Sequence, residues 1–136
     1  MALISAPWRL FHIICVQIYT VVVREKRVYD AAEASDGHRV LIDHVWPRGV
    51  SRERAHLDEW ARELAPSDDL RTWFAHVPER FEQFRVRYRD ELAAHADALE
   101  QLRDRASTGT VTIVYAARDR EHNNAVVLAE LLRDGC

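Results

Sequence analysis

The sequence predicts an α/β fold: a small, mostly parallel sheet flanked by helices, in a single domain. Three observations support this prediction. The chain has 136 residues, close to the most common size of one domain, and its 4 glycines and 4 prolines leave little room for linkers. The run of Val40, Leu41 and Ile42 is continuously apolar, the pattern of a strand covered on both faces. Strand, short loop and helix also follow one another in the order typical of a parallel sheet with crossover connections.

The charge of the chain is balanced, which argues against a protein dedicated to nucleic acid. It carries 19 basic and 22 acidic residues, a net charge of −3, whereas nucleic-acid binders show a strong basic excess. We expect no broad basic surface. A contact with nucleic acid through a local basic patch is still compatible with the sequence. The two cysteines, Cys15 and Cys136, form neither a disulfide framework nor a CxxC pair, which predicts a reduced, cytoplasmic setting.

The apolar N-terminal segment does not fit a membrane anchor, and we expect no membrane partner. Residues 10–23 contain a histidine and a glutamine and are fewer than the roughly 20 residues that a spanning helix needs. We interpret residues 1–15 as an extension and residues 16–136 as the domain. The β-branched segment 17–24 predicts the first strand, and residues 26–30 either extend it or form a second short strand.

The next segments predict a connector, a strand and a helix. Residues 31–37 are polar and end in a Ser-Asp-Gly turn signal. Residues 38–46 contain three consecutive aliphatic residues and predict a buried strand, which Pro47 ends. Residues 51–65 predict a helix, because apolar residues recur at the spacing of one helical face. These residues are Leu57, Trp60, Ala61 and Leu64.

The C-terminal half predicts four further helices and one strong strand. Ser67 is a natural N-cap for a short helix, and Pro78 suits the start of the next, whose aromatic stripe is typical of a core face. A further helix ends near residues 107–109. Residues 110–116 predict the clearest strand, and residues 125–132 predict a final apolar helix.

The candidate site lies in two turns that follow predicted strands. The first turn contains Asp43, Arg48 and their neighbours, and the second contains Arg118 and Asp119. Ligands of open α/β sheets bind beyond the carboxyl ends of the strands. If the two strands are parallel and adjacent, Arg48 and Arg118 flank the start of the last helix, where guanidinium groups and free N–H groups favour an anion.

Each of these residues also has a purely structural interpretation. Arg48 can pair with Asp43, Asp119 can cap the last helix, and Asn123 can serve only as a turn residue. Trp46 can be a packing residue that ends its strand. These alternatives stay open at the level of the sequence.

Two histidines are placed for proton transfer, and no cofactor or metal site is evident. His44 and His122 lie in the two turns, although a lone histidine near a turn often only holds structure. The histidines lack the spacing of metal ligands. The sequence has no P-loop and no GxGxxG or GxSxG motif, so we expect neither a metal nor a common nucleotide cofactor.

With these segments in place, the sequence closely resembles the YeaO-like family, a group of domains of unknown function (DUF488). The resemblance spans about residues 24–133, and its most specific parts are the WPRG and YAARD…HN segments. It is carried by residues 27–30, 35–43, 46–49, 57–60, 64–67, 70–71, 111–119, 122–123 and 125–128. The family has no established activity, so the resemblance implies a shared fold and no particular reaction. The family commonly has arginine where this chain has His44, and an aromatic residue where it has His38.

Three functional hypotheses follow. In the first, an enzyme or binding protein takes a small anionic, phosphate-bearing ligand. Arg48, Arg118, His44, Trp46 and Asn123 would then line the site, Asp43 or Asp119 would orient a group or accept a proton, and His122 would act as acid or base. In the second, a non-catalytic module contacts protein or nucleic acid through exposed arginines. These are Arg48, Arg52, Arg54, Arg118 and Arg120. In the third, all these charges are purely structural.

Overall fold

We describe a computed structural model of the chain, covering residues 20–134. Within this range four strands form one parallel sheet in the order β1-β4-β2-β3. The strands are β1 (Val22–Arg27), β2 (His38–Leu41), β3 (Glu59–Trp60) and β4 (Thr110–Tyr115). The α/β fold with a mostly parallel sheet, predicted from the sequence, is therefore confirmed, and all the described strand pairings are parallel. The proposed extension 1–15 and the start of the predicted first strand lie outside the described residues.

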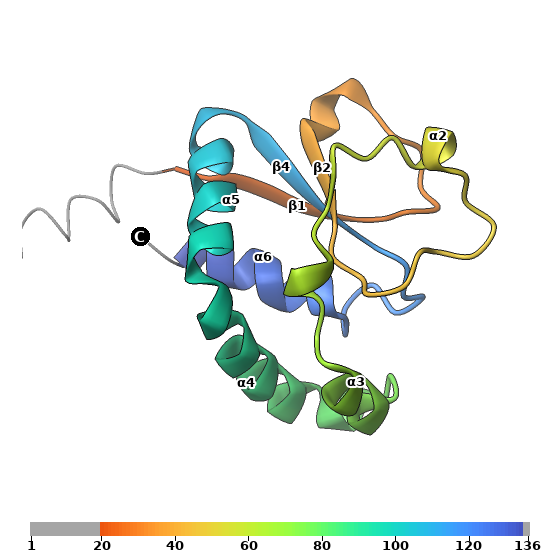
Figure 1. Cartoon of the computed structure of the whole chain (residues 1–136), viewed down its shortest axis with the longest axis vertical. Helices are drawn as coiled ribbons and strands as arrows, with labels where there is room; N and C mark the ends of the chain where they lie inside the picture. Colours follow the sequence, from red (N-terminus) through yellow and green to blue (C-terminus); the bar gives the residue numbers. More distant parts are fainter. Residues whose placement is uncertain (1–19, 135–136) are drawn as a thin grey trace, which may run out of the picture.

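Helices cover the sheet unequally (Figure 1). The α-helices are α2 (Arg52–Ala55), α3 (Asp68–Phe74), α4 (Phe81–Leu92), α5 (Ala96–Thr108) and α6 (Asn124–Asp134). Short 3-10 turns are η1 (Ala34–Asp36), η2 (Arg62–Leu64), η3 (Pro78–Arg80) and η4 (Ala93–His95). In Figure 1, α3 to α6 gather on one side of the sheet, and α2 lies apart from them. No helix within residues 20–134 is long and apolar enough to cross a membrane.

The two faces of the sheet bury two separate hydrophobic clusters, because side chains alternate along each strand. Val111, Ile113 and Tyr115 of β4 enter the large cluster, which also holds the apolar faces of α3 to α6. Val114, between them, enters a smaller cluster with Leu41 and the aromatic rings that follow β2. The aromatic stripe of α4 lies in the large cluster, as expected for core residues.

The predicted helix 51–65 is wrong. Only α2 is α-helical there, and His56 ends it in a left-handed conformation with φ 47°. The backbone then pairs with β2, since the N–H of Ala61 bonds to the carbonyl of Leu41 at 2.8 Å. The apolar residues that suggested one helical face are divided between the two clusters: Leu57 and Trp60 pack in the small one, and Ala61 and Leu64 in the large one. Because the segment passes from one face of the sheet to the other, its apolar residues show the spacing of a helical face although the segment is not a helix.

The bounds of two strands also differ from the prediction. Within the described residues, β1 overlaps the predicted strand 17–24 at residues 22–24 and continues through Arg27. Of residues 26–30, which the sequence allowed either to extend this strand or to form a second one, the first two extend it. β2 ends at Leu41 instead of near residue 46. The N–H of Ile42 still bonds to Val114 at 3.2 Å, after which the chain leaves the sheet. This early departure leaves the following turn free to line a pocket.

Candidate functional site

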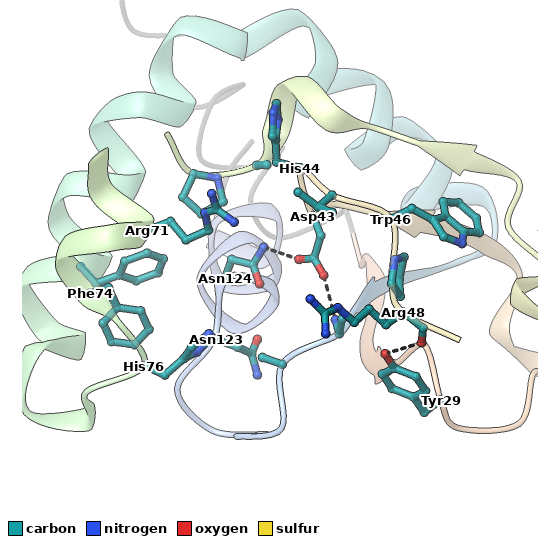
Figure 2. A pocket seen from close by; sticks show the side chains of 17 residues that line it. Tyr29, Asp43, His44, Trp46, Arg48, Arg71, Phe74, His76, Asn123 and Asn124 are labelled. Atoms are coloured by element: carbon teal, nitrogen blue, oxygen red, sulfur yellow. Dashed lines mark hydrogen bonds between the residues drawn. The ribbon is translucent and has the colours of Figure 1, made fainter. Parts of the chain in front are cut away.

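A pocket of about 360 Å³ lies at the carboxyl edge of β2 and β4, beside the start of α6. The two strands are adjacent and parallel, with Val40 opposite Ile113, so both predicted turns do emerge at the same edge. The pocket is lined by the turn after β2, the turn after β4, and parts of α3 and α4 (Figure 2). Its position is the one at which open α/β sheets bind ligands.

Asp43 forms the floor of this pocket and joins three elements. One carboxylate oxygen accepts the N–H of Ala116, just after β4, at 2.9 Å, and the other accepts the side-chain N–H of Asn124, in α6, at 3.0 Å. Burial raises the pKa of the Asp43 carboxyl above its ordinary value, although these hydrogen bonds and the charges of His76 and Arg71 act against the rise. The site therefore holds a partly buried carboxyl that has donors but no close cationic partner among the described residues.

Two arginines reach the pocket from different elements. In Figure 2 the side chains of Arg48 and Arg71 enter from opposite sides and point toward the space beside Asp43. The turn that carries Arg48 is fixed by Tyr29, whose hydroxyl donates to the Arg48 carbonyl at 3.0 Å. Arg71 stands on α3 and has an exposed pairing with Asp68 at 3.1 Å. No described residue accepts a hydrogen bond from the guanidinium of Arg48.

The start of α6 is built into the pocket wall. Asn123 is buried and caps the helix, since its side-chain oxygen accepts the N–H of Val126 at 3.0 Å. Its amide nitrogen donates to the carbonyl of Asp119 at 2.9 Å, and Asn124 also reaches the carbonyl of Ile42 at 3.3 Å. These bonds fix both asparagines, so the pocket wall next to Asp43 is rigid and polar.

Five of the residues predicted from the sequence line this pocket: Asp43, His44, Trp46, Arg48 and Asn123. They do not contribute equally. The ring of His44 is exposed and, in Figure 2, is directed away from Asp43, as is the ring of Trp46. The Trp46 indole donates to the carbonyl of Val50 at 2.7 Å and meets Trp60 edge-on at 5.2 Å, which is the packing role that the sequence left open.

Three predicted residues do not line the pocket. Arg118 is exposed, and Asp119 and His122 pair with each other at 2.9 Å. Backbone N–H groups of Glu121 and His122, together with the His122 ring, lower the pKa of the Asp119 carboxyl. The Asp119 carboxylate orders the turn before α6. The sequence offered Asp119 as a possible cap of this helix, but Asn123 is the residue that caps it. Arg48 and Arg118 are therefore not brought together in this pocket.

Sequence reasoning missed Arg71 and His76 as pocket residues and treated Asn124 only as part of a turn. Arg71 and His76 come from α3 and the loop after it, which are distant in sequence from both turns. No motif marks them. His76 has φ 57°, an uncommon conformation for a residue with a side chain, but nothing in the sequence indicates this.

No group of three or more metal-ligating side chains occurs within the described part of the chain. The pocket contains one carboxylate, and its histidines, His44 and His76, belong to different loops. The pocket thus has one carboxyl, that of Asp43, at its floor. Apolar side chains and the guanidinium groups of Arg48 and Arg71 line the rest.

Comparisons with known proteins confirm the resemblance to the YeaO-like family. A model described as the inactive DUF488-N3 subclade (DUF488-N3i) matches residues 22–136. The uncharacterized protein YeaO of Escherichia coli K12 is 44% identical over 108 residues, covering 79% of this chain and 94% of YeaO. The uncharacterized protein Rv3073c of Mycobacterium tuberculosis H37Rv is 43% identical over 110 residues, covering 81% and 92%. No solved structure matches. This chain is a member of the DUF488 family, with YeaO-like relatives along nearly their whole length.

Proposed function

We propose that this domain binds a small molecule with an anionic group, phosphate above all, in the pocket between Arg48 and Arg71. The observation that carries the proposal is the approach of these two guanidinium groups from opposite sides of one cavity. A guanidinium donates paired, parallel hydrogen bonds that suit phosphate and carboxylate oxygens. Arg48 has no acceptor among the described residues, so an incoming anion need not displace a protein carboxylate from it.

The charge balance of the pocket supports an anionic ligand. Arg48 and Arg71, with His76 when protonated, surround a single carboxyl, that of Asp43. The pocket also lies beside the N-terminus of α6. The positive end of the helix dipole and the backbone N–H groups of a first turn favour negative charge nearby.

We favour binding without turnover. The residues expected to transfer protons, Asp119 and His122, bond to each other outside the pocket, which leaves Asp43 as its carboxyl. The description of the matched family model as an inactive subclade points in the same direction.

The competing hypothesis is an interaction module that contacts protein or nucleic acid through exposed arginines. Fewer of these arginines are free to bind a partner than the sequence suggested. Arg120 makes a two-bonded ion pair with Asp30, at 2.8 and 3.0 Å. The guanidinium of Arg52 lies 4.7 Å from the ring centre of Trp46 and 5.7 Å from that of Trp60. Arg48 faces the pocket. A salt-sensitive interaction module therefore has fewer free cations than the sequence implied, and we do not adopt it.

The test is a thermal-shift and calorimetric screen against phosphate, pyrophosphate, nucleotides and dicarboxylates. A ligand at 100 times its Kd stabilises the folded state by about 2.7 kcal/mol. We expect Arg48→Ala and Arg71→Ala each to weaken binding of the stabilising anion at least about tenfold, since a charge-assisted hydrogen bond contributes about 1.5–3 kcal/mol.

Two control variants separate the pocket from general surface charge. Arg105→Ala removes an exposed arginine from α5, and Arg118→Ala removes the arginine that the sequence had paired with Arg48. Both should bind the anion as the wild type does. The proposal fails if no anion stabilises the wild type, or if all four variants respond alike.

A further inference from the structure

The floor of the pocket has a hydrogen-bonding pattern that selects a kind of ligand. An ionised carboxylate only accepts hydrogen bonds, at about four lone-pair positions. Oδ2 of Asp43 already accepts the Ala116 N–H, and Oδ1 already accepts the Asn124 side chain. Each oxygen therefore uses one lone pair for the protein and keeps one for a ligand. The two free acceptor positions belong to the two oxygens of one carboxylate.

The setting of this pair favours a ligand that donates two N–H groups. Asp43 is partly buried, and no described cation lies within ion-pair distance of it. Burial disfavours its charge, which the raised pKa of this carboxyl reflects. Two further hydrogen bonds to the ionised form offset that cost. In Figure 2 the carboxyl is directed into the space between Asn124 and Arg48, where a ligand edge can reach it.

The pocket walls suit a flat ring. Phe74 and Phe84 lie on the side of α3 and α4, stacked at 4.5 Å between ring centres. Pro66, Pro47 and Ala117 supply further apolar lining. Aromatic and proline surfaces pack against planar heterocycles, and about 360 Å³ lies within the size range of small-molecule sites.

We infer that the ligand is a fused heterocycle with the 2-amino-4-oxopyrimidine edge of guanine or a pterin, attached to an anionic tail. This inference rests on the proposed anion site and extends it. The ring N–H and the adjacent amino N–H of that edge are parallel donors, which match the two free lone pairs of Asp43. Its tail, phosphate in a guanine nucleotide or carboxylate in a folate-type pterin, meets Arg48 and Arg71.

The same pattern disfavours adenine. Its pairing edge places an amino donor beside an unprotonated ring nitrogen, which is an acceptor and would face a second acceptor on Asp43. Hypoxanthine has the ring N–H but lacks the amino group, so it donates to one oxygen only, and the other keeps its protein donor alone. The loss of one hydrogen bond to a charged acceptor weakens binding by about 1.5–3 kcal/mol.

The experiment is isothermal titration of the wild-type chain with GMP, IMP, AMP, folate and inorganic phosphate. We expect GMP or folate to bind at least about tenfold more tightly than IMP, and AMP to bind no better than phosphate. Which of the two binds identifies the source of the edge. Asp43→Asn, with a donor in place of one acceptor, should lose this preference of GMP or folate over IMP. Asp69→Asn, at an exposed position on α3, should behave as wild type.

The outcomes separate this inference from the proposed function. If phosphate binds and Arg48→Ala abolishes that binding, but GMP, IMP, AMP and folate do not differ, the anion site stands and the heterocycle is wrong. If neither phosphate nor any other anion binds, both fail. The comparison of GMP with IMP uses wild-type protein alone, so a fold defect in Asp43→Asn, checked by circular dichroism, leaves the test intact.

Discussion

At the scale of single residues, Asp43 has a structural role beside the binding role that we propose for it. Its carboxylate joins the turn after β4 to α6, and its burial makes the charged form costly. Because its folded pKa is raised above its ordinary value of 3.8, the folded state holds this proton more tightly than the unfolded chain. The contribution of Asp43 to stability is therefore greatest below pH 3.8 and is lost as the pH rises through the folded pKa.

We predict that Asp43→Asn removes this loss. The free energy of unfolding of the variant, minus that of the wild type, should rise with pH from about 3.8 through the folded pKa of Asp43. Hydrogen bonds that are lost in the variant lower its free energy of unfolding by the same amount at every pH, so they do not change this rise. Urea unfolding at a series of pH values measures the difference, with Asp69→Asn as the exposed control. A difference that is constant or falls with pH would contradict the assignment.

Gly37 provides a second prediction at this scale. It has φ 64°, and a Cβ at this position would lie 2.2 Å from the carbonyl oxygen of Thr110. Gly49 has a similar φ of 73°, but a Cβ there meets nothing within 4 Å. We expect Gly49→Ala to cost about 1–2 kcal/mol from backbone conformation alone, and Gly37→Ala to cost about 3 kcal/mol or more because the sheet must also move. Equal costs in denaturant unfolding would show that this close approach is absent.

At the scale of elements, α6 connects the core to the pocket. Its residues Val127, Leu128 and Leu132 are fully buried in the large cluster, while its first turn lines the site. A shift of this helix thus changes both packing and ligand geometry. Asn123 controls its start through the bond from the Val126 N–H.

We predict that Asn123→Ala destabilises the fold by about 1 kcal/mol, the usual cost of removing an N-cap side chain. Asn123→Asp keeps the capping oxygen and places a negative charge at the helix start, so it should recover part of that stability. The same charge lies in the pocket wall and should weaken anion binding. Denaturant unfolding and calorimetry of the two variants measure these opposite effects. If Asn123→Asp binds the anion more tightly than wild type, this wall does not face the ligand.

At the scale of the whole molecule, stability in acid depends on carboxyls that the fold keeps charged. Asp36 is buried against Arg39 at 2.6 Å and Lys26 at 3.2 Å. Burial alone would raise its pKa, but the backbone N–H of Glu33 and these two cations together lower it below 3.8. Arg39 also donates to the carbonyls of Ala55 and His56, so the pair ties β2 to the segment after α2.

We predict that this pair contributes to acid unfolding. Stability from a carboxyl with a lowered folded pKa is present above pH 3.8 and is lost as the pH falls through the folded value. The stability of Asp36→Asn should be lower than that of wild type at pH 7 and should decline less steeply below pH 3.8. Chemical unfolding between pH 2 and 7 tests this, with Asp68→Asn as an exposed control. A slope below pH 3.8 as steep as that of wild type would contradict it.

Local patterns in the sequence predicted most of the elements in the described residues. The caps and runs around Ser67, Pro78 and residues 110–116 correspond to α3, η3 and β4, because each signal depends on neighbours along the chain. The helix 51–65 was wrong because its apolar residues serve two clusters on opposite faces of the sheet. Helical spacing alone does not distinguish these cases.

The residues of the candidate site also fall into two groups, those that local sequence patterns predicted and those that only the tertiary structure revealed. The sequence by itself predicted polar turns after two strands, and it proposed Asp43 and Arg48 as site residues on the condition that these strands are parallel and adjacent. The structure meets this condition, and both residues line the pocket. Only the tertiary structure decided that Arg71 lies across from Arg48, while Arg118 stays exposed. The physical reason is that Arg71 is placed by the packing of Phe74 against Phe84, a contact between helices that the chain's local pattern does not encode.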